Sequence, residues 1–233
     1  MELSDGSATF TGCDEEKRPL KGHAHAYIIP ESIQALGRGR DGEVTHVTVY
    51  APAGFGPREI TALEALRKVC GSGLEVLQLT LLGLGHPENF GGTDGARGES
   101  PLLAESHSWI SRTPFIPTRH PKATRAGAPK LDPSGLQIGN PEHELRRHLG
   151  LAGFPEPVAI EPVFFTEITG ERVEWSSFRR ARITGDGRRA GSAGYGFRIE
   201  FLEAVRGPVA LGYGAHFGMG GFGAVEVDDE SRR

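Results

Sequence analysis

Nine histidines supply most of the acid–base chemistry that this chain could perform. His23 and His25 are two positions apart, so on a strand both side chains would project from one face. His46 follows on the next strand-like segment and could approach them. Imidazole titrates near neutral pH, so these three residues suit metal-free acid–base work on a phosphodiester, or together a zinc ion. The residues alone leave both chemistries open, beside a purely structural role.

A fourth histidine, His120, lies in the segment TPFIPTRHPK at residues 113–122, close to Arg119 and Lys122. The prolines stiffen this segment and lower the entropy lost when it is held against a ligand. Separately, His46 opens the sequence HVTV, which is similar to the His-x-Thr motif of cyclic-phosphodiester hydrolases. That family needs two copies of the motif, and this chain has one.

Basic residues are concentrated locally, although the net charge of the 233 residues is −4. Of the 26 bases, 21 are Arg, the side chain suited to bidentate phosphate contacts. Residues 112–130 contain five bases and no acid, and residues 172–198 contain seven Arg against two acids. Such a basic face is compatible with a polyanion, the alternative being solvated Arg on strand edges. The candidate RNA-binding cations are Arg112, Arg119, Lys122, Arg125, Arg146, Arg147, Arg179, Arg180, Arg182 and Arg198.

A glycine-rich cluster fills residues 212–223 near the C-terminal end. Residues 218–223 match G-x-G-x-x-G, but a dinucleotide fingerprint must follow the first strand and open a helix. The composition indicates instead a loop whose N–H groups approach phosphates and whose aromatic residues stack bases. A tight turn packed on a sheet is the alternative. The candidate residues are Gly212, Tyr213, Gly214, His216, Gly218 and Gly220.

Hydrophobic periodicity predicts an α+β fold with a mainly antiparallel sheet rather than a doubly wound sheet. Helices are expected at 57–70 and 140–150, the latter with Asn140 as cap and Pro141 at its first position. Residues 1–20 are expected to form an irregular leader, and residues 83–101 a long Gly-rich loop. Strands are expected at 24–29, 44–50, 74–82, 106–116, 158–165, 173–183, 197–202 and 224–227.

Composition also excludes several classes of protein. No run of about 18 apolar residues is present, so no membrane span is expected, and the N-terminus lacks the apolar region of a secretory signal. The two cysteines, Cys13 and Cys70, have no Cys-x-x-Cys spacing, which argues against a disulfide scaffold or a cysteine zinc site. These features favour a cytoplasmic protein.

Several sequence blocks resemble one known family. They are GHAHAYIIP at 22–30, HVTVYAP at 46–52, TPFIPTRHPK at 113–122, and GFRIEF at 196–201 with GPVALGYGAHFG at 207–218. In this order they resemble the repeat-RNA-processing half of the fused CRISPR-associated proteins of type I-U/I-G systems, in the RAMP superfamily. The likeness extends over about residues 17–224. The fused family carries a second RAMP-type half in front, and this chain is expected to start near the junction.

The resemblance implies ferredoxin-like (RRM-related) RAMP modules with a C-terminal glycine-rich loop. A RAMP-type domain would cover residues 21–228, with two ferredoxin-like halves at about 21–104 and 105–228. The family activity is metal-independent endonuclease cleavage of CRISPR repeat RNA to guide RNA, which leaves a 2′,3′-cyclic phosphate and a 5′-OH. No cofactor is expected. The implied partners are the repeat or guide RNA and other subunits of a type I effector complex that serves antiviral defence.

Cleavage of this kind needs a base, an acid and a cation at the phosphate. The acid and base are expected to come from His23 or His25, with His46 and His120 as further candidates. Lys122 or Arg119 is the expected cation. Two alternatives stay open. A non-catalytic RNA-binding subunit would keep the basic segment and the glycine loop without using the histidines. A zinc-dependent hydrolase would use His23, His25 and His46 as ligands.

Overall fold

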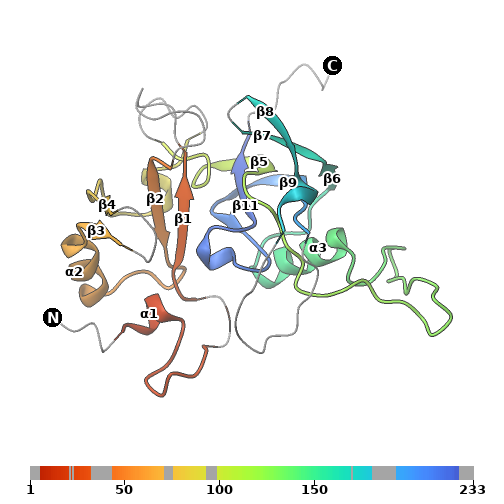
Figure 1. Cartoon of the computed structure of the whole chain (residues 1–233), viewed down its shortest axis with the longest axis horizontal. Coiled ribbons are helices and arrows are strands. Elements are labelled where there is room, and N and C mark those ends of the chain that lie inside the picture. Colours follow the sequence, from red (N-terminus) through yellow and green to blue (C-terminus); the bar gives the residue numbers. More distant parts are fainter. Residues whose placement is uncertain are drawn as a thin grey trace. The chain divides into compact units, whose positions relative to one another are not determined.

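A computed structural model describes residues 6–20, 22, 24–32, 44–70, 76–92, 99–168, 170–179 and 193–225. The chain forms two compact units. Unit 1 contains Met1–Tyr27 and Val49–His86, and unit 2 contains Ile28–Thr48 and Pro87–Arg233. The elements of both units are coloured along the chain in Figure 1.

Unit 1 is built around helix α2, which covers Pro57–Ala65. Gly56 caps the helix, and Pro57 provides the fixed φ that suits the first position. The helix ends sooner than the expected residue 70 because Leu66 takes an extended conformation. The chain then enters the short strand β3 (Lys68–Val69), which pairs antiparallel with β4 (Leu77–Gln78).

Two further expectations in unit 1 need correction. Part of the expected leader is helical, since α1 covers Ala8–Thr11 and the Ser7 hydroxyl oxygen accepts the Thr9 N–H at 3.1 Å. The strand expected at 74–82 is limited to β4 among its described residues. No residue of α2 is buried, so this part of the chain has little core to extend a strand against.

Strands β1 (Tyr27–Glu31) and β2 (His46–Tyr50) pair with one another, and the division between the units falls within each of them. Both strands were expected, β1 two to three residues earlier. Within unit 2, the Thr45 N–H donates to the Glu31 carbonyl oxygen at 2.9 Å. The hydroxyls of Thr48 and Ser100 both donate to the Glu31 carboxylate, which therefore joins β1, β2 and the segment before β5.

The main sheet of unit 2 has five strands in the order β10-β11-β5-β9-β6, with every neighbouring pair antiparallel. Because β5 and β6 are both antiparallel to β9, they are parallel to each other. Helix α3 (Pro141–Leu151) connects them in the sequence, so β5, α3 and β6 form a split βαβ unit with β9 between the strands. The strand bounds are Glu105–Ser111 for β5, Ala159–Val163 for β6, Gly196–Arg206 for β9, Val209–Ala210 for β10 and Gly221–Ala224 for β11.

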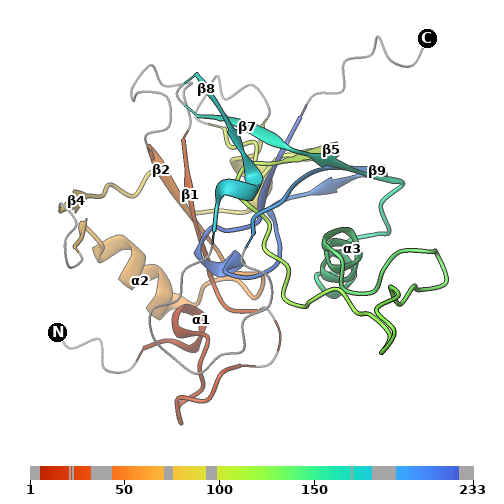
Figure 2. The same cartoon turned by 45° about the vertical axis from the view of Figure 1, so that its right-hand side comes forward.

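One face of this sheet packs against α3. Trp109 of β5 lies opposite Ile199 of β9, and both are fully buried. Leu145 and Leu149 of α3 are packed in the same hydrophobic cluster. Figure 2 shows α3 lying below β9. The helix begins as the sequence predicted, with the Asn140 side chain accepting the His143 N–H at 2.7 Å.

A second hairpin follows β6. It consists of β7 (Phe165–Ile168) and β8 (Glu171–Glu174), and the 3-10 helix η3 (Trp175–Ser177) ends it. The sequence predicted a single strand at 173–183. This prediction is wrong for residues 175–179, because the chain turns at η3 after Glu174. Residues 180–183 lie outside the described residues. Two other 3-10 helices are η2 (Pro87–Asn89) and η4 (Ala215–Phe217).

The predicted fold class, α+β with a mainly antiparallel sheet and few helices, is confirmed. Among the described residues no helix is long and apolar enough to span a bilayer, and α3, at 11 residues, is longer than α1 and α2.

Candidate nucleic-acid interface

The basic segment forms a projecting arm, here defined as residues 119–138 of unit 2. Two successive turns shape it, closed by the bridges Ala123↔Pro129 and Leu131↔Gln137. The backbone groups of Lys122, Lys130 and Ile138 hydrogen-bond to one another at 2.8–3.0 Å, which holds the two turns together. Figure 1 shows the arm in green, extending to the right beyond α3.

The arm presents four cations without carboxylate partners. Arg119, Lys122, Arg125 and Lys130 are all exposed, and no ion pair links them to any described residue. The single acid of the arm, Asp132, accepts hydrogen bonds from the Ser134 hydroxyl and the Ser134 and Leu136 N–H groups. The hydrogen bond from the Ser134 hydroxyl contributes most to lowering the pKa of Asp132. The arm therefore offers uncompensated positive charge to solvent.

The segment that leads into the arm is held between two other parts of unit 2. Phe115 exchanges both backbone hydrogen bonds with Tyr195 at 2.9 Å, and the Ile116 carbonyl oxygen accepts the Tyr213 N–H at 3.0 Å. Successive residues of an extended chain direct these groups to opposite sides. The pair 115–116 thus lies between Tyr195 and the glycine loop, which we define as residues 212–220. The Thr113 hydroxyl adds a hydrogen bond to the Gly218 carbonyl oxygen at 2.7 Å.

The glycine loop carries exposed aromatic faces on a tightly packed backbone. Phe217 is 77% exposed, and Tyr213 and Tyr195 are 37% exposed. Gly220 has φ +59, and a Cβ there would overlap the Leu211 carbonyl oxygen. At Gly218, with φ +82, a Cβ would lie 2.5 Å from Pro30 Cδ. These contacts within the chain explain both glycines by packing, while close approach of the backbone to phosphates stays a prediction.

A polar cluster around the buried Glu144 lies at the base of the arm, where Thr118 meets α3. The Glu144 side chain is fully buried and accepts from Arg147 Nε at 3.0 Å and from Arg147 Nη2 at 2.8 Å. The Thr118 hydroxyl lies 3.1 Å from Glu144 Oε2, 2.9 Å from Arg147 Nη2 and 3.0 Å from His148 Nε2. Arg147 Nη2 also lies 3.0 Å from His148 Nε2. One loop residue and three helix residues therefore share a single network.

The protonation state of Glu144 follows from its surroundings. Burial raises the pKa of the Glu144 carboxyl, but the hydrogen bond and charge of Arg147, with the Thr118 hydroxyl, outweigh burial and lower the pKa overall. The nearby His148 also lowers this pKa, by a smaller amount.

The other predicted cations differ in how available they are to a ligand: Arg146 and Arg198 are engaged by other side chains, whereas Arg112 and Arg179 are exposed and have no ion pair with a described residue. Arg146 pairs with Glu142 and Glu156 at 3.1 and 2.7 Å. Arg198 donates to the Ser108 hydroxyl at 3.1 Å, and the Arg112 side chain covers Gly223. Arg179 is exposed beside the bridge to Ala193, and Arg180 and Arg182 lie outside the described residues.

The predicted catalytic histidines belong to both units. His25 is in unit 1, where its ring lies beside Gly12. His46 and His120 are in unit 2: His46 Nδ1 lies 2.9 Å from the Thr45 hydroxyl, and His120 is exposed on the arm. His23 lies outside the described residues. Over the described part of the chain, no three His, Cys, Asp or Glu side chains are grouped as metal ligands.

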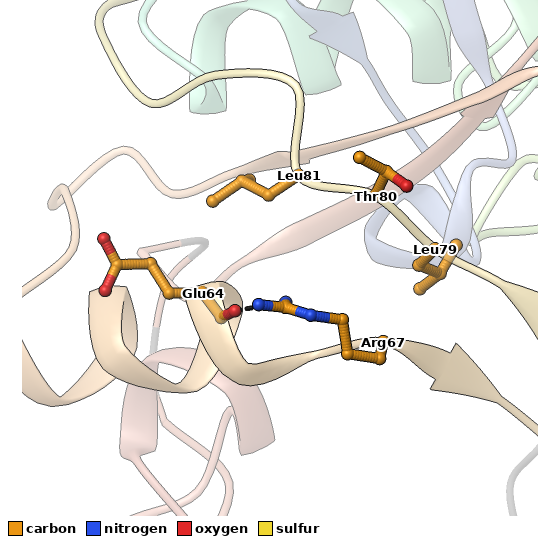
Figure 3. A pocket seen from close by; sticks show the side chains of 5 residues that line it. All are labelled: Glu64, Arg67, Leu79, Thr80 and Leu81. Carbon is orange, nitrogen blue, oxygen red and sulfur yellow. Dashed lines mark hydrogen bonds between the residues drawn. The ribbon is translucent and has the colours of Figure 1, made fainter.

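Unit 1 contains a pocket of about 430 Å³, shown in Figure 3. It is lined by Glu64, Arg67, Leu79, Thr80 and Leu81. The Arg67 guanidinium donates to the carbonyl oxygens of Glu64 and Leu66 at the end of α2. The Arg67 guanidinium therefore caps the C-terminal end of the helix, where positive charge is favourable. Because it is used in this way, it does not indicate a ligand for the pocket.

Comparison with models of protein families, with curated proteins and with solved structures found no match. The site therefore rests on geometry. Sequence reasoning missed Thr118, Glu144 and His148. A signal was present: Glu144 and His148 are four residues apart, beside Leu145 and Leu149, which places both polar side chains at the edge of the buried face of a helix.

Proposed function

We propose that this protein is a cytoplasmic endoribonuclease of the CRISPR guide-maturation type, which binds repeat RNA and cleaves it without a metal ion. The observation that carries RNA binding is the arm, where four exposed cations have no carboxylate partner among the described residues. The segment 113–116, which leads into the arm, is hydrogen-bonded to the glycine loop. Cleavage, the repeat substrate and the partner subunits of a type I effector complex are proposed from the family resemblance of the sequence blocks.

The proposal includes a ferredoxin-like, RAMP-type assignment for unit 2. The split βαβ unit of β5, α3 and β6 around β9 supports it, since this arrangement is part of ferredoxin-like folds. The position of the glycine loop also supports it, because this loop precedes β11 near the C-terminal end of the described residues.

The interface combines two kinds of contact that suit RNA. Exposed Arg and Lys side chains neutralise the phosphates of RNA and position the RNA strand without reading its sequence. The exposed rings of Tyr195, Tyr213 and Phe217 offer faces on which unpaired bases can stack. Tyr195 and the glycine loop are hydrogen-bonded to the chain at 113–116, and this segment leads into the arm. One RNA strand that follows the segment could therefore contact the arm and both aromatic segments.

The proposed chemistry is attack of a ribose 2′-OH on the adjacent phosphate. The 2′ oxygen–phosphorus bond forms and the bond to the 5′ oxygen breaks; a base takes the 2′ proton, and an acid gives one to the 5′ oxygen. His23, His25, His46 and His120 remain the candidates for these roles. His120 is next to Arg119 and two residues from Lys122, either of which could stabilise the phosphorane charge. Positioning of the RNA by the interface would supply part of the rate.

The test is incubation of the purified protein with end-labelled repeat RNA in excess EDTA, followed by end-group analysis. We expect cleavage at one position, with a 2′,3′-cyclic phosphate on the 5′ product and a free 5′-OH on the other. Tight binding without any cleavage would overturn the proposal that the protein is an enzyme and favour a non-catalytic RNA-binding subunit. Activity that disappears in EDTA and returns with Zn²⁺ would favour the zinc-dependent hydrolase instead.

A further inference from the structure

We propose that Arg147 is a phosphate ligand at the base of the arm, held in orientation by Glu144 and Thr118. This inference rests on the proposed RNA-binding function. It adds the contacts that orient Arg147, a cation that the sequence offers as an RNA-binding candidate. Arg147 is ion-paired, and a count of free cations would leave it out. The geometry of its contacts indicates a different use.

Only one edge of the Arg147 guanidinium is engaged. Nε and Nη2 face the Glu144 carboxylate and the Thr118 hydroxyl, whereas Nη1 makes no hydrogen bond to any described residue. The Arg147 side chain is 22% exposed, while that of Glu144 is fully buried. A guanidinium has five N–H donors in a fixed plane, so an anchored edge fixes the direction of the remaining ones. Arg147 can therefore donate to an anion from the solvent side without rearranging.

Arg146 provides the contrast within the same helix. Its Nε and Nη2 donate to Glu142, and its Nη1 donates to Glu156 at 2.7 Å and to the Pro157 carbonyl oxygen. All three nitrogens are engaged, and two carboxylates surround one charge. Arg147 shares a single carboxylate, and that carboxylate is out of contact with solvent.

The location of Arg147 suits a phosphate that also contacts the arm. Thr118, which bonds to the Arg147 guanidinium, immediately precedes Arg119, the first cation of the arm. Thr118 therefore holds the Arg147 guanidinium next to the point at which the arm begins. The groups that face Arg147 from both elements are Glu144 and His148 of α3 and Thr118 of the segment before the arm.

The variant Glu144→Gln distinguishes a positioning role of Glu144 from a simple effect of its negative charge. This variant removes one negative charge near the RNA, so long-range electrostatics alone predicts tighter binding to a polyanion. Positioning predicts weaker binding. Nε and Nη2 donate to different carboxylate oxygens, and the amide nitrogen that replaces one of them can only donate, so one contact is lost and the guanidinium loses its orientation. We expect the affinity for repeat RNA to fall at least about threefold. Unchanged or tighter binding by the folded variant would overturn the positioning role.

Thr118 gives a second variant that keeps the charge and the fold. Thr118 is exposed, so Thr118→Val should fold, and it removes the hydroxyl that bonds Arg147. Thr118→Ser keeps the hydroxyl and is the matched control. Weaker RNA binding by Thr118→Val but not by Thr118→Ser supports the proposal, and equal binding by the two variants contradicts it.

The phosphate contact itself is tested by salt dependence, with inorganic-salt titrations of repeat-RNA affinity. Arg147→Ala should reduce the slope of log K against log salt by about 0.7, the value for one contact to a single strand, whereas Arg146→Ala should leave it unchanged. A reduction of the same size in both variants, or in neither, would overturn the inference. An arm variant, Arg119→Ala with Lys122→Ala, measured in parallel distinguishes the two proposals. If that variant loses slope and Arg147→Ala does not, only the Arg147 role fails. If neither does, the interface itself is wrong.

Discussion

The arm and helix α3 are adjacent in sequence and both contain Arg or Lys residues, yet these bases differ in their partners. The four cations of the arm have no carboxylate partner among the described residues. In α3, Arg146 pairs with Glu142 and Glu156, and Arg147 with Glu144. The difference shows that the number of bases in a segment does not predict the positive charge that it offers to a ligand.

Secondary structure explains the difference. A helix places residues three and four apart side by side, so Glu142 reaches Arg146 and Glu144 reaches Arg147. The arm has turns and prolines in place of a helix, and its single acid, Asp132, is bound to its own turn. Extended chain brings no carboxylate to its bases, which therefore remain available to a partner.

The largest effect should come from a histidine that acts in cleavage rather than binding. His25→Ala is expected to slow cleavage of repeat RNA in EDTA by about 10²-fold, the loss typical of a missing acid or base. RNA affinity should hardly change, because His25→Ala leaves the proposed binding residues of the arm, the glycine loop and α3 intact. His86→Ala is the matched control, since His86 is an exposed histidine of the same unit.

Single-turnover rates and separate binding measurements check this expectation. Wild-type cleavage by His25→Ala would remove His25 from the catalytic candidates and direct the same test to His23, His46 and His120. Loss of affinity in the folded variant would instead show that His25 contributes to RNA binding. Binding would then not be confined to the arm, and the comparison of the arm with α3 would not explain RNA affinity.

The second prediction addresses the arm directly. Replacing Arg119 and Lys122 together with Ala should weaken binding to unrelated RNA sequences alike, because phosphate contacts carry no sequence information. The slope of log K against log salt should fall by about 1.4, or about 0.7 for each contact. Fluorescence anisotropy between about 50 and 300 mM KCl, on a repeat RNA and a scrambled one, measures both quantities.

The double variant Arg58→Ala with Lys68→Ala removes the same charge from exposed positions of unit 1 and is the control. An equal loss of slope in the control would mean that net charge, rather than the arm, sets RNA affinity. A changed preference between the two RNAs with an intact slope would indicate base contacts instead.

Much of this arrangement was accessible from the sequence, for identifiable reasons. Helix α3 was predicted almost to the residue, because Asn140 and Pro141 mark its start and local signals of this kind are independent of tertiary structure. The fold class followed from alternating segments such as β2 and β9. The prolines and bases of residues 112–130 indicated an extended basic segment; residues 118–130 are exposed, whereas residues 114–117 are buried.

The rest depends on contacts between distant residues. Nothing local shows that Phe115 pairs with Tyr195, or that Thr118 meets Glu144 at a distance of 26 positions. Helix α2 was predicted too long because the periodic apolar residues up to Val69 indicate a helix, whereas pairing of β3 with β4 ends it at Ala65. Arg146 and Arg147 are identical in the sequence, and only their partners distinguish them.

The smallest effect concerns stability, and it separates the two regions by pH. The arm cations are exposed and form no ion pair with a described residue, so Arg119→Ala with Lys122→Ala should leave the Tm unchanged. Glu144→Gln removes a hydrogen-bonded charge and should cost about 1.5 kcal/mol at pH 7, or roughly 3–6 °C in Tm for a chain of this size. Thermal unfolding followed by circular dichroism measures both variants.

The pH dependence of that difference has a definite sign. The folded state lowers the pKa of Glu144 below its ordinary value of 4.5, so the ionised carboxylate stabilises the fold fully above that value. Its contribution is lost as the pH falls through the lowered pKa, because protonation then becomes favourable in the folded state as well. The Tm gap between wild type and Glu144→Gln should therefore be constant near neutral pH and shrink below about pH 4.5. A gap that persists unchanged at low pH would show that packing of the side chain, and not its ion pair with Arg147, stabilises the base of the arm.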